Sequence, residues 1–379
     1  MNPKARSSLS GTPRATLLLV GGGHAHVAVL ADWIRRGQPP GTRTLLLTPD
    51  RHLRYSGMVP GWLAGQHRQD EGLVDLAALA ARAGVEWVQG RCVALDPEAR
   101  VMRSDSGVSI AFDIASLDTG GEGRAAALLG GDPRLLDVRP IGRFVARMAA
   151  APAPRRVVVA GGGAGGVELA FGLRNLASAP ERPEVALVAG AQGLLPGFAP
   201  AVRRRAARAL ARQGIALHIA DLRLEAGALR AGATTLEPAD CIVAALGSAA
   251  PAWLRESGLA LDTEGFVQVD ARQVSTSHPH ILAAGDVAAR IDRPLAHAGV
   301  HAVFAGPVLA ANLRALAAGA SPRHTYRPRW NNLYLLNTGD GRAIASYGPL
   351  AAEGRWVLRL KHAIDKGWIA KYAKLARHA

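Results

Sequence analysis

A glycine-rich turn near the middle of the chain constrains the fold more than any other feature. An apolar, β-branched run at 157–160 leads into Gly161, Gly163 and Gly166, which have the spacing G-x-G-x-x-G, and a helix-forming segment follows. The first glycine permits a tight turn, the second lets the backbone approach a pyrophosphate, and the third lets helix and strand pack closely. Free N–H groups at the start of the helix attract an anion. This stretch therefore predicts a strand–turn–helix unit that binds a dinucleotide.

A second turn of the same kind lies about 140 residues upstream. There an apolar run at 17–20 enters Gly21 and Gly23, and His26 stands where the third glycine would be. A side chain at that position should hold the following helix slightly further from the strand. Two such turns predict an α/β protein with two Rossmann-like dinucleotide-binding domains, one for FAD and one for NAD(P)H.

The length of 379 residues is sufficient for two such domains and an appendage. A Pro- and Ala-rich segment at 149–154 is the clearest linker, and it precedes the glycine turn in the middle of the chain. We predict the first part of the FAD domain at 14–148, the NAD(P) domain at 155–265, the second part of the FAD domain at 266–328, and a small C-terminal α+β region at 329–379.

Composition narrows the class of protein. The formal charge of +15 comes from arginines scattered along an Ala/Gly/Arg-rich chain, without an RNA-binding motif, so nucleic acid is not an expected partner. The two cysteines, Cys92 and Cys241, stand far apart in apolar segments and are predicted to be buried, inert thiols in a reducing compartment. The sequence shows no signal peptide and no apolar run of about 18 residues, which predicts a cytoplasmic protein, soluble or peripheral to a membrane. No metal site is predicted.

The remaining segments alternate as this fold requires. Helices are predicted at 25–36, 201–213 and 299–316, and residues 85–112 have the pattern of a β-meander. An apolar strand at 281–284 ends in Gly285 and Asp286, which would deliver one carboxylate at a tight turn.

The ends of two predicted strands bear on ribose recognition. The strand at 44–48 is followed by Pro49 and Asp50, so Thr48 and Asp50 are both candidates for a ribose contact, and Asp50 is equally well explained as a turn residue.

In the second domain, the strand at 185–188 ends in Ala189 and Gly190. These residues supply neither the carboxylate expected for the ribose of NADH nor the arginine expected for the phosphate of NADPH. We therefore predict weak discrimination between the two nucleotides.

An ordered set of motifs resembles the pyridine nucleotide-disulfide oxidoreductase superfamily over nearly the whole chain. The motifs are GGGHAH (21–26), TPDRHLRYSGMVPGWLAG (48–65), GGGAGGVELA (161–170), ALG (245–247) and HPHILAAGD (278–286). Several of them are similar to type II NADH dehydrogenases and sulfide:quinone oxidoreductases. Together with KHAIDKGW (361–368), they are most similar to the oxidoreductase domain that precedes a selenophosphate synthetase in some proteins, a second domain that this sequence lacks.

The resemblance implies a set of FAD contacts. Gly21 and Gly23 would hold the FAD pyrophosphate, with Thr48 near the adenosine ribose, and Asp286 would accept hydrogen bonds from the ribityl chain. The alternative for Asp286 is a helix cap. Arg51 and the turn at Gly57 would lie along the flavin, and the helix start at Gly299 and Val300 would support negative charge on it. Further cofactor contacts are expected at His24, His26, Asp50, Val93, Gly247 and Gly285.

The resemblance also implies how the nicotinamide and the protons are handled. Gly161, Gly163 and Gly166 would face NAD(P)H, and Glu168 would lie near the nicotinamide. Glu168 could equally stabilise the helix dipole as a first-turn carboxylate. His297 and His301 are candidate proton donors, for which capping or solvated roles are the alternative, and His24 and His26 could serve in packing instead.

Departures from the superfamily pattern exclude some chemistry. Residues 48–65 contain no cysteine and therefore no C-x-x-x-x-C pair, and Cys92 and Cys241 are poorly placed for a thiol relay. Direct transfer remains, from NAD(P)H through FAD to an acceptor such as a quinone. One alternative is a sulfur or selenium compound as substrate. The other is an FAD-binding regulatory module that has lost nicotinamide turnover, which the sequence Ala189-Gly190 favours.

The tail, residues 353–379, combines an apolar stripe with basic residues. Four of the five lysines lie in it, and the spacing predicts two short amphipathic helices hinged at Gly367. A lysine-rich face beside Trp and Tyr is typical of a helix lying on an anionic membrane surface, here the inner face. The alternative is that the stripe packs on the protein's own core or on a second copy in a homodimer. The apolar positions are Trp356, Val357, Leu360, Ile364, Trp368, Ile369, Tyr372 and Leu375.

Overall fold

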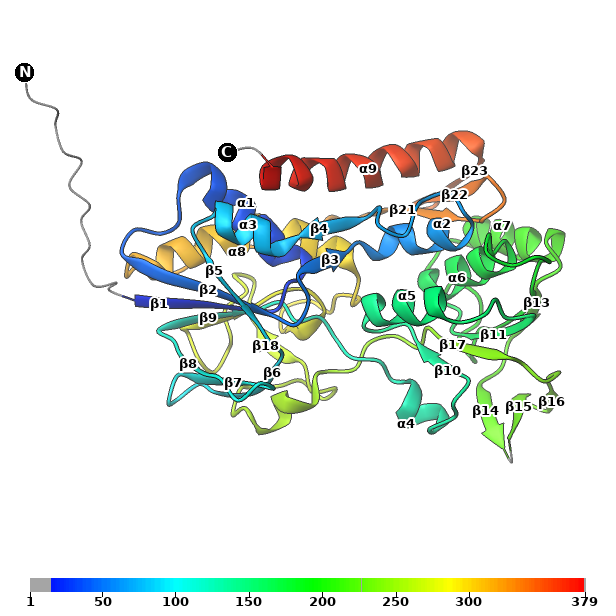
Figure 1. Cartoon of the computed structure of the whole chain (residues 1–379), viewed down its shortest axis with the longest axis horizontal. Coiled ribbons are helices and arrows are strands. Elements are labelled where there is room, and N and C mark those ends of the chain that lie inside the picture. Colours follow the sequence, from blue (N-terminus) through cyan, green and yellow to red (C-terminus); the bar gives the residue numbers. More distant parts are fainter. Residues whose placement is uncertain (1–14, 226, 378–379) are drawn as a thin grey trace, which may run out of the picture.

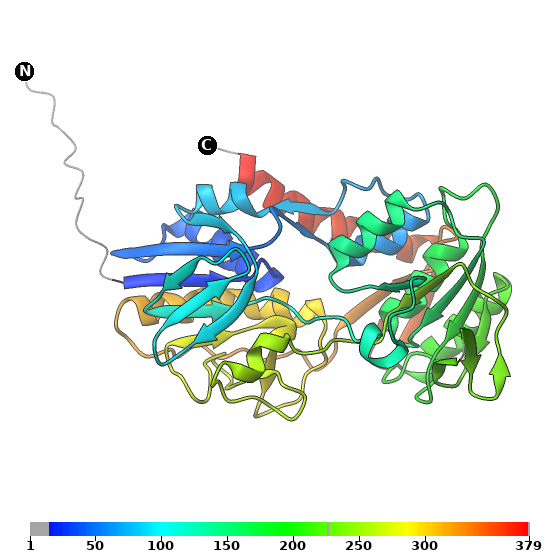
Figure 2. The ribbon, with the colours of Figure 1, turned by 60° about the horizontal axis from the view of Figure 1, so that its bottom comes forward.

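The computed structural model describes residues 15–225 and 227–377. It has two lobes, each built on a five-stranded parallel sheet flanked by helices (Figures 1 and 2). The predicted α/β fold with two Rossmann-like domains is confirmed. A small antiparallel sheet and a long helix form the C-terminal region.

The first lobe contains the sheet of order β19-β9-β1-β2-β5. Each neighbouring pair in it is parallel, so all five strands present their C-terminal ends at one edge. Its strands are β1 (Ala15–Val20), β2 (Thr42–Thr48), β5 (Glu86–Gln89), β9 (Ile114–Leu117) and β19 (Ile281–Ala283). All are mostly buried except β5, which lies at the edge of the sheet.

Helices α1 (His24–Arg36) and α8 (Gly299–Ala317) pack against each other beside this sheet. α8 is long and apolar enough to cross a membrane by length and composition, and its inner residues belong to the same hydrophobic core as α1. The smaller elements of the lobe are β3 (His52–Arg54), η1 (Ser56–Met58), β4 (Leu73–Asp75), α3 (Leu76–Arg82), η2 (Ala252–Glu256), β18 (Val267–Val269), η3 (Gly285–Val287) and β20 (Ala288–Arg290). α2 (Val59–Leu63) follows η1, but its Val59 and Leu63 belong to the hydrophobic core of the second lobe.

The predicted β-meander at 85–112 is only partly correct. β5 leaves it to join the parallel sheet next to β2, because its residues pair in parallel with Leu45 to Thr48. The three strands that remain form a separate antiparallel sheet: β6 (Cys92–Asp96), β7 (Val101–Ser104) and β8 (Ser109–Ala111).

The second lobe contains the sheet of order β10-β17-β11-β12-β13, and all its pairs are parallel. The strands are β10 (Leu135–Asp137), β11 (Arg156–Ala160), β12 (Glu184–Val188), β13 (Ala216–His218) and β17 (Cys241–Ala244). A small antiparallel sheet is added by β14 (Leu222–Glu225), β15 (Ala228–Ala231) and β16 (Thr234–Thr235). The helices are α4 (Ala125–Leu129), α5 (Ile141–Ala150), α6 (Ala164–Arg174) and α7 (Pro200–Arg212).

Both internal boundaries of the second lobe differ from those predicted. β10 pairs with β17, and α5 contributes Phe144 to the core of the second lobe, so this lobe begins well before residue 155. At the other end, Leu254 and Leu259 pack in the core of the first lobe, so the chain has returned there before residue 266. The Pro/Ala segment at 149–154 therefore forms the end of α5 and the loop that leads to β11, and it is not the domain boundary.

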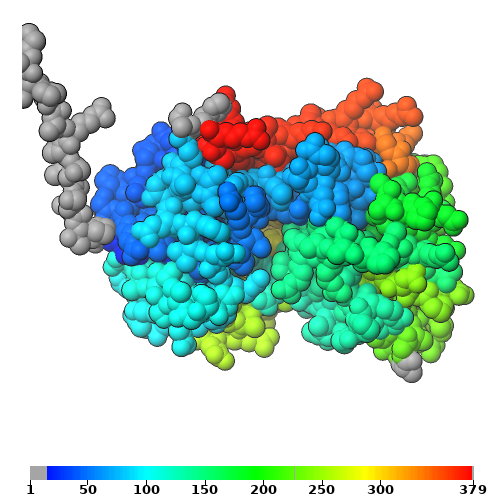
Figure 3. All heavy atoms as spheres, viewed as in Figure 1, coloured from blue at the N-terminus to red at the C-terminus, as the bar shows by residue number. Residues whose placement is uncertain are grey.

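The tail forms one helix and not two. α9 (Arg355–Arg377) continues through Gly367, whose Cβ position is open. A glycine inside a helix costs about 1 kcal/mol, and packing on both sides of it offsets that cost. α9 lies along the top of Figure 1 over both lobes, and Figure 3 shows it as a ridge. The adjoining strands are β21 (Leu333–Asn337), β22 (Ala343–Tyr347) and β23 (Leu350–Gly354).

Candidate functional site

The first glycine turn joins β1 to α1 and leaves the start of the helix open. Gly21 has φ +95°, and Gly23 precedes the helix without a side-chain cap. A Cβ at Gly23 would overlap the carboxylate of Asp118. The backbone here can approach a pyrophosphate closely, as the FAD assignment requires.

His26 is not a cofactor contact, which corrects the prediction. Its side chain is fully buried beneath the turn, and both ring nitrogens are occupied. Nδ1 lies 2.6 Å from the carbonyl oxygen of Gly21, and Nε2 lies 2.8 Å from the hydroxyl of Ser116. Burial lowers the pKa of His26 to about 4, so the neutral ring donates to the carbonyl and accepts from the serine. In place of a third glycine, the hydrogen-bonded side chain of His26 supports the turn.

Asp118, which the sequence analysis did not single out, lies under this site at the end of β9. It is almost fully buried and accepts the N–H of His26 at 2.9 Å. A Cβ at Gly285 would lie 2.7 Å from its Oδ1, so both glycine turns that face the FAD site close over this one carboxylate. Burial, with a smaller contribution from the charge of Asp286, raises the pKa of Asp118 to about 7.

Asp286 lies in η3 after Gly285, whose φ is +70°. Its Oδ2 forms an ion pair of 2.8 Å with Arg139, which comes from the segment between β10 and α5 in the second lobe. The carboxylate is therefore not simply a helix cap. It stands where the two lobes meet, in a position that fits the ribityl contact expected of it.

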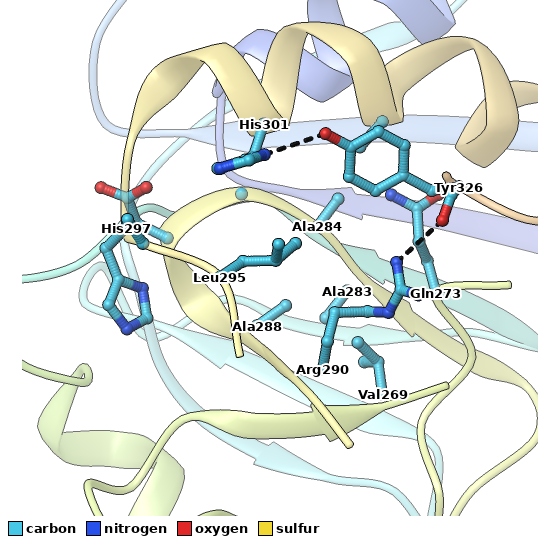
Figure 4. Close-up of a pocket in the computed structure, with 14 residues that line it drawn as sticks. Val269, Gln273, Ala283, Ala284, Ala288, Arg290, Leu295, His297, His301 and Tyr326 are labelled. Atoms are coloured by element: carbon cyan, nitrogen blue, oxygen red, sulfur yellow. Dashed lines mark hydrogen bonds between the residues drawn. The ribbon is translucent and has the colours of Figure 1, made fainter. Parts of the chain in front are cut away.

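A small cavity of about 30 Å³ adjoins Gly285 and Asp286. In Figure 4, His301 points at the hydroxyl of Tyr326, 3.0 Å away, and Arg290 donates to the carbonyl oxygen of Tyr326 at 3.1 Å. His297 points away from His301 and packs on the ring of Phe266, with centroids 4.0 Å apart. Both candidate proton donors thus flank the start of α8, and each is held by an aromatic partner.

The N-termini of α1 and α8 converge. A Cβ at Gly299 would lie 3.9 Å from the ring of His24, and α8 begins after Ala298 without a side-chain cap. Two helix N-termini therefore face the same region. Asp118 already accepts the N–H of His26 at the start of α1, but the partial positive charge of both helix ends suits a ligand with negative charge at two points. Burial lowers the pKa of His24 to about 4, so this ring adds no positive charge at neutral pH.

The other predicted FAD contacts lie around this region at different depths. Thr48 is buried, and its hydroxyl would be 3.1 Å from a Cβ at Gly22, whereas Asp50 is exposed. Arg51 pairs with Asp75 at 2.9 Å at the start of α3. The two remaining predicted contacts are Gly57 in η1, which packs on the ring of Tyr55, and Val93 in β6, which is half exposed.

The second glycine turn joins β11 to α6 in the same manner. Gly161 has φ +124°, and a Cβ at Gly166 would overlap the carbonyl oxygen of Gly161. The Cβ position of Gly163 faces open space at the uncapped start of α6. Gly247, with φ +88°, is exposed after β17. The turn is thus open above the helix end and closed beneath it, as a pyrophosphate site requires.

Glu168 lies in α6 within a buried ionic cluster. Its Oε1 accepts the N–H of Asn337 at 2.8 Å and lies 3.7 Å from the Lys361 ammonium. Lys361 also lies 3.3 Å from Asp365, which accepts the hydroxyl of Tyr55 at 3.2 Å. We call Glu168, Lys361, Asp365 and Tyr55 the ionic cluster. It joins both lobes and the tail, so a dipole role alone does not describe Glu168.

The ionic cluster holds two carboxylates against one ammonium. Burial raises the pKa values of Glu168 and Asp365, and the charge of Lys361 only partly opposes this effect. Burial disfavours the Lys361 ammonium, but the two carboxylates outweigh it and raise the pKa of that group. Each acid of the ionic cluster therefore holds a proton more tightly than an exposed carboxyl group does.

Trp368 connects the tail to the FAD site. Its ring stacks on Tyr55 with centroids 4.9 Å apart, and it lies 5.1 Å from the ring of His24 at the start of α1. From the sequence, Trp368 was expected only as part of an apolar stripe and Lys361 only as a basic residue. The motif KHAIDKGW was the available signal, because its lysine, aspartate and tryptophan all reach the site.

A second group of residues continues from the ionic cluster toward the surface. His67 is buried, packs on His362 with centroids 4.6 Å apart, and lies 3.2 Å from the carboxylate of Glu71. Glu71 also lies 3.8 Å from Lys366, which is exposed on α9. Glu71 therefore links the buried ring of His67 to the exposed ammonium of Lys366.

Cys92 and Cys241 are free, buried thiols in different hydrophobic cores. Burial raises the pKa of each to about 12. A thiolate is the reactive form of cysteine, so neither residue is poised for chemistry at neutral pH.

Comparison with known protein families identifies the family of the chain. Residues 15–305 match the family described as pyridine nucleotide-disulphide oxidoreductase. The chain belongs to this family. The protein is therefore an oxidoreductase with FAD as its cofactor and a nicotinamide nucleotide as its substrate. The two open glycine turns and the Asp286 carboxylate fit these ligands.

Solved structures with the same fold carry the names of enzymes with different reaction partners. The sulfide:quinone oxidoreductase from the hyperthermophilic bacterium Aquifex aeolicus is 17% identical, with a TM-score of 0.75 over 95% of this chain and 92% of that one. The water-forming NADH oxidase from Lactobacillus brevis bound to NADH is 18% identical, with a TM-score of 0.72 over 88% and 75%. The ferredoxin reductase for the CYP199A2 system of Rhodopseudomonas palustris is 22% identical, with a TM-score of 0.69 over 87% and 81%. No curated protein matches the chain.

Proposed function

We propose that this protein passes electrons from NAD(P)H through FAD to a quinone, in the manner of a type II NADH dehydrogenase and without a redox-active disulfide. The ionic cluster is the observation that carries the proposal. It is buried between the nicotinamide lobe, the FAD lobe and the tail, and its groups can supply protons but not thiol chemistry. When bound, FAD takes up a hydride and releases two electrons.

The proton balance defines what the ionic cluster contributes. One NAD(P)H, one proton and one quinone yield NAD(P)+ and a quinol, so one proton must come from the protein and ultimately from solvent. Lys361 or one of the carboxyl groups of Glu168 and Asp365, whose pKa values burial raises, can donate it, and Tyr55 can hold an acceptor oxygen by its hydroxyl. The route by His67 and Glu71 can then return the proton.

The placement of the cysteines favours a quinone over a sulfur or selenium compound. A relay of persulfide or selenide would need an exposed, ionisable thiol near the flavin, whereas Cys92 and Cys241 are buried in separate cores. Because of the resemblance to a domain that precedes a selenophosphate synthetase, a sulfur or selenium compound is tested as an alternative substrate in the experiment below. A regulatory FAD-binding module is the third candidate, and the gap at Ala189-Gly190 favoured it.

The apolar surface around α9 supports access to a lipid-soluble acceptor. Trp356, Leu360 and Ile364 form an exposed row at helical spacing. The face of the small sheet that packs on α9 continues past it as three further exposed side chains, which are paired across the strands: Leu333, Tyr347 and Leu350. We call these six residues the apolar surface. Flanking Arg355, Arg359 and Lys366 are exposed and would face anionic lipid.

The opposite side of α9 belongs to the protein's own core. Val357, Leu358 and Tyr372 are buried, and Lys361 and Asp365 belong to the ionic cluster. The tail thus both packs internally and leaves an apolar row outside. We propose that the enzyme is cytoplasmic and rests on the inner face of the membrane through the apolar surface, and that a homodimer contact there is the competing arrangement.

Anaerobic stopped-flow measurements of Lys361→Met test the function. With NADH or NADPH, flavin bleaching should stay within about threefold of wild type. Reoxidation by a short-chain quinone should slow by about 10²-fold or more, since a positioned proton donor contributes that much. Lys371→Met, an exposed lysine on the same helix, is the control and should change neither step.

Three outcomes would contradict the proposal. Equal quinone rates in wild type and Lys361→Met would remove the ionic cluster from the acceptor step. Faster reoxidation by a persulfide or selenium species than by quinone would favour the second class. Failure of both nucleotides to bleach the wild-type flavin would leave the regulatory module.

A further inference from the structure

A carboxylate lies beside the end of β12, although it belongs to a segment far from β12 in the sequence. β12 ends at Val188, and Gly190, with φ +71°, has no side chain to offer a ribose. Asp221 follows the neighbouring strand β13, more than thirty residues further along the chain, and its Oδ1 accepts the N–H of Ala191 at 3.1 Å. The carboxylate therefore stands beside the end of β12.

The carboxylate of Asp221 lies close to where a side chain at position 190 would begin. A Cβ built on Gly190 would lie 3.6 Å from Asp221 Oδ1. The segment is tied to the β12 loop a second time, because Gly190 donates its N–H to the carbonyl oxygen of Ala220 at 3.1 Å. Within the ranges that the structure describes, Oδ2 of Asp221 forms no hydrogen bond, and the residue is exposed. One oxygen is thus anchored, and the other is available to a ligand.

The same loop also packs on the glycine turn. Leu195 donates its N–H to Gly162 at 2.7 Å, and a Cβ at Gly162 would lie 2.6 Å from the carbonyl oxygen of Ala189. A dinucleotide whose pyrophosphate lies at the start of α6 passes its adenosine over the end of β12 in this fold. Asp221 lies at that edge, one strand further from the turn.

We propose that Asp221 binds the adenosine ribose and makes this enzyme prefer NADH to NADPH. A carboxylate accepts hydrogen bonds from the 2′- and 3′-hydroxyls of NADH, and it repels the 2′-phosphate of NADPH. The proposal rests on nicotinamide use but not on the identity of the acceptor. It departs from the weak discrimination predicted from Ala189 and Gly190, because the discriminating group comes from a different strand.

The experiment compares binding of ADP-ribose and of 2′-phospho-ADP-ribose to the FAD-loaded protein by calorimetry. Wild type should bind ADP-ribose at least about tenfold more tightly. Asp221→Asn should weaken ADP-ribose binding and strengthen binding of the phosphorylated fragment, so that the ratio falls by about tenfold or more. The rates of flavin bleaching by NADH and NADPH should follow the same order.

Asp240→Asn is a matched control, because Asp240 also accepts backbone N–H groups in this lobe, from Arg155 and Arg156, on a different connection. It should leave the ratio unchanged, and retained FAD will show that each variant is folded. An unchanged ratio in Asp221→Asn, a wild-type preference for the phosphorylated fragment, or binding of neither fragment would overturn the inference. If the wild-type protein prefers ADP-ribose as expected but does not reduce quinone, the result would count against the proposed acceptor and not against the role of Asp221.

Discussion

Replacing Asp118 with asparagine should remove a pH-dependent penalty on FAD binding. The carboxyl is closed in between Gly23 and Gly285, and burial raises its pKa from 3.8 to about 7. Three units correspond to about 4 kcal/mol between the protonated and ionised forms in the folded protein. Because the folded state holds this proton more tightly than the unfolded state, stability falls as pH rises from about 4 to about 7 and is level above that.

The affinity for FAD should depend on pH for the same reason. Its pyrophosphate adds negative charge at the helix start that Asp118 supports, so binding favours the protonated carboxyl and takes up a proton at neutral pH. Above pH 7 the Kd for FAD of wild type should therefore rise by up to about tenfold per pH unit. Asp118→Asn should keep a nearly constant Kd, because the amide carries no charge at any of these values.

Equilibrium dialysis of FAD between pH 6 and 9 measures the effect directly. Asp113→Asn is the control, because Asp113 accepts the N–H of Thr16 at the exposed opposite end of the same sheet. Its Kd should follow the wild-type curve. A wild-type Kd that does not depend on pH, or an equally steep curve in Asp118→Asn, would refute the assignment of the proton to Asp118.

Two further predictions concern the second glycine turn and the apolar surface. Gly166→Ala should abolish NADH binding while FAD is retained, because the added Cβ would overlap the carbonyl oxygen of Gly161; calorimetry with ADP-ribose measures this, and Gly165→Ala, whose Cβ position is open, is the control. Replacing Trp356, Leu360 and Ile364 with serine should reduce co-sedimentation with anionic vesicles at least tenfold while flavin bleaching persists, whereas undiminished binding, or a salt-independent shift from dimer to monomer, would assign the row to a protein contact.

The sequence predicted the regular parts of the fold because local patterns determine them. Both glycine turns and their flanking strands and helices lie where the spacing placed them, since apolar runs and glycine positions specify strand, turn and helix within about 15 residues. The lobe boundaries were wrong because they depend on strand pairing. β10 belongs to the second lobe through its register with β17, about 100 residues away, which no local composition records.

The site residues that were missed share a different cause. Asp118 and Asp221 are single carboxylates at the ends of strands, and each acquires its role from a glycine in another segment: Gly23 and Gly190. His26 was misassigned for the same reason, because its partner Ser116 lies 90 positions away in the sequence. Such contacts depend on which strands are neighbours in a sheet. The motifs indicate the class of fold but not these individual contacts.

The tail shows why one amphipathic pattern supported two interpretations. An ideal stripe has one apolar face, but α9 carries two: Val357 and Tyr372 are buried against the protein, and Trp356, Leu360 and Ile364 are exposed. Lys361, counted in the sequence among the basic residues, is buried opposite Glu168. α9 completes the ionic cluster on one side and presents an apolar row on the other, and under the proposed function this arrangement would couple acceptor chemistry to a surface. Variants of the outer row should therefore change access of a lipid-soluble quinone without changing reduction of the flavin by NADH.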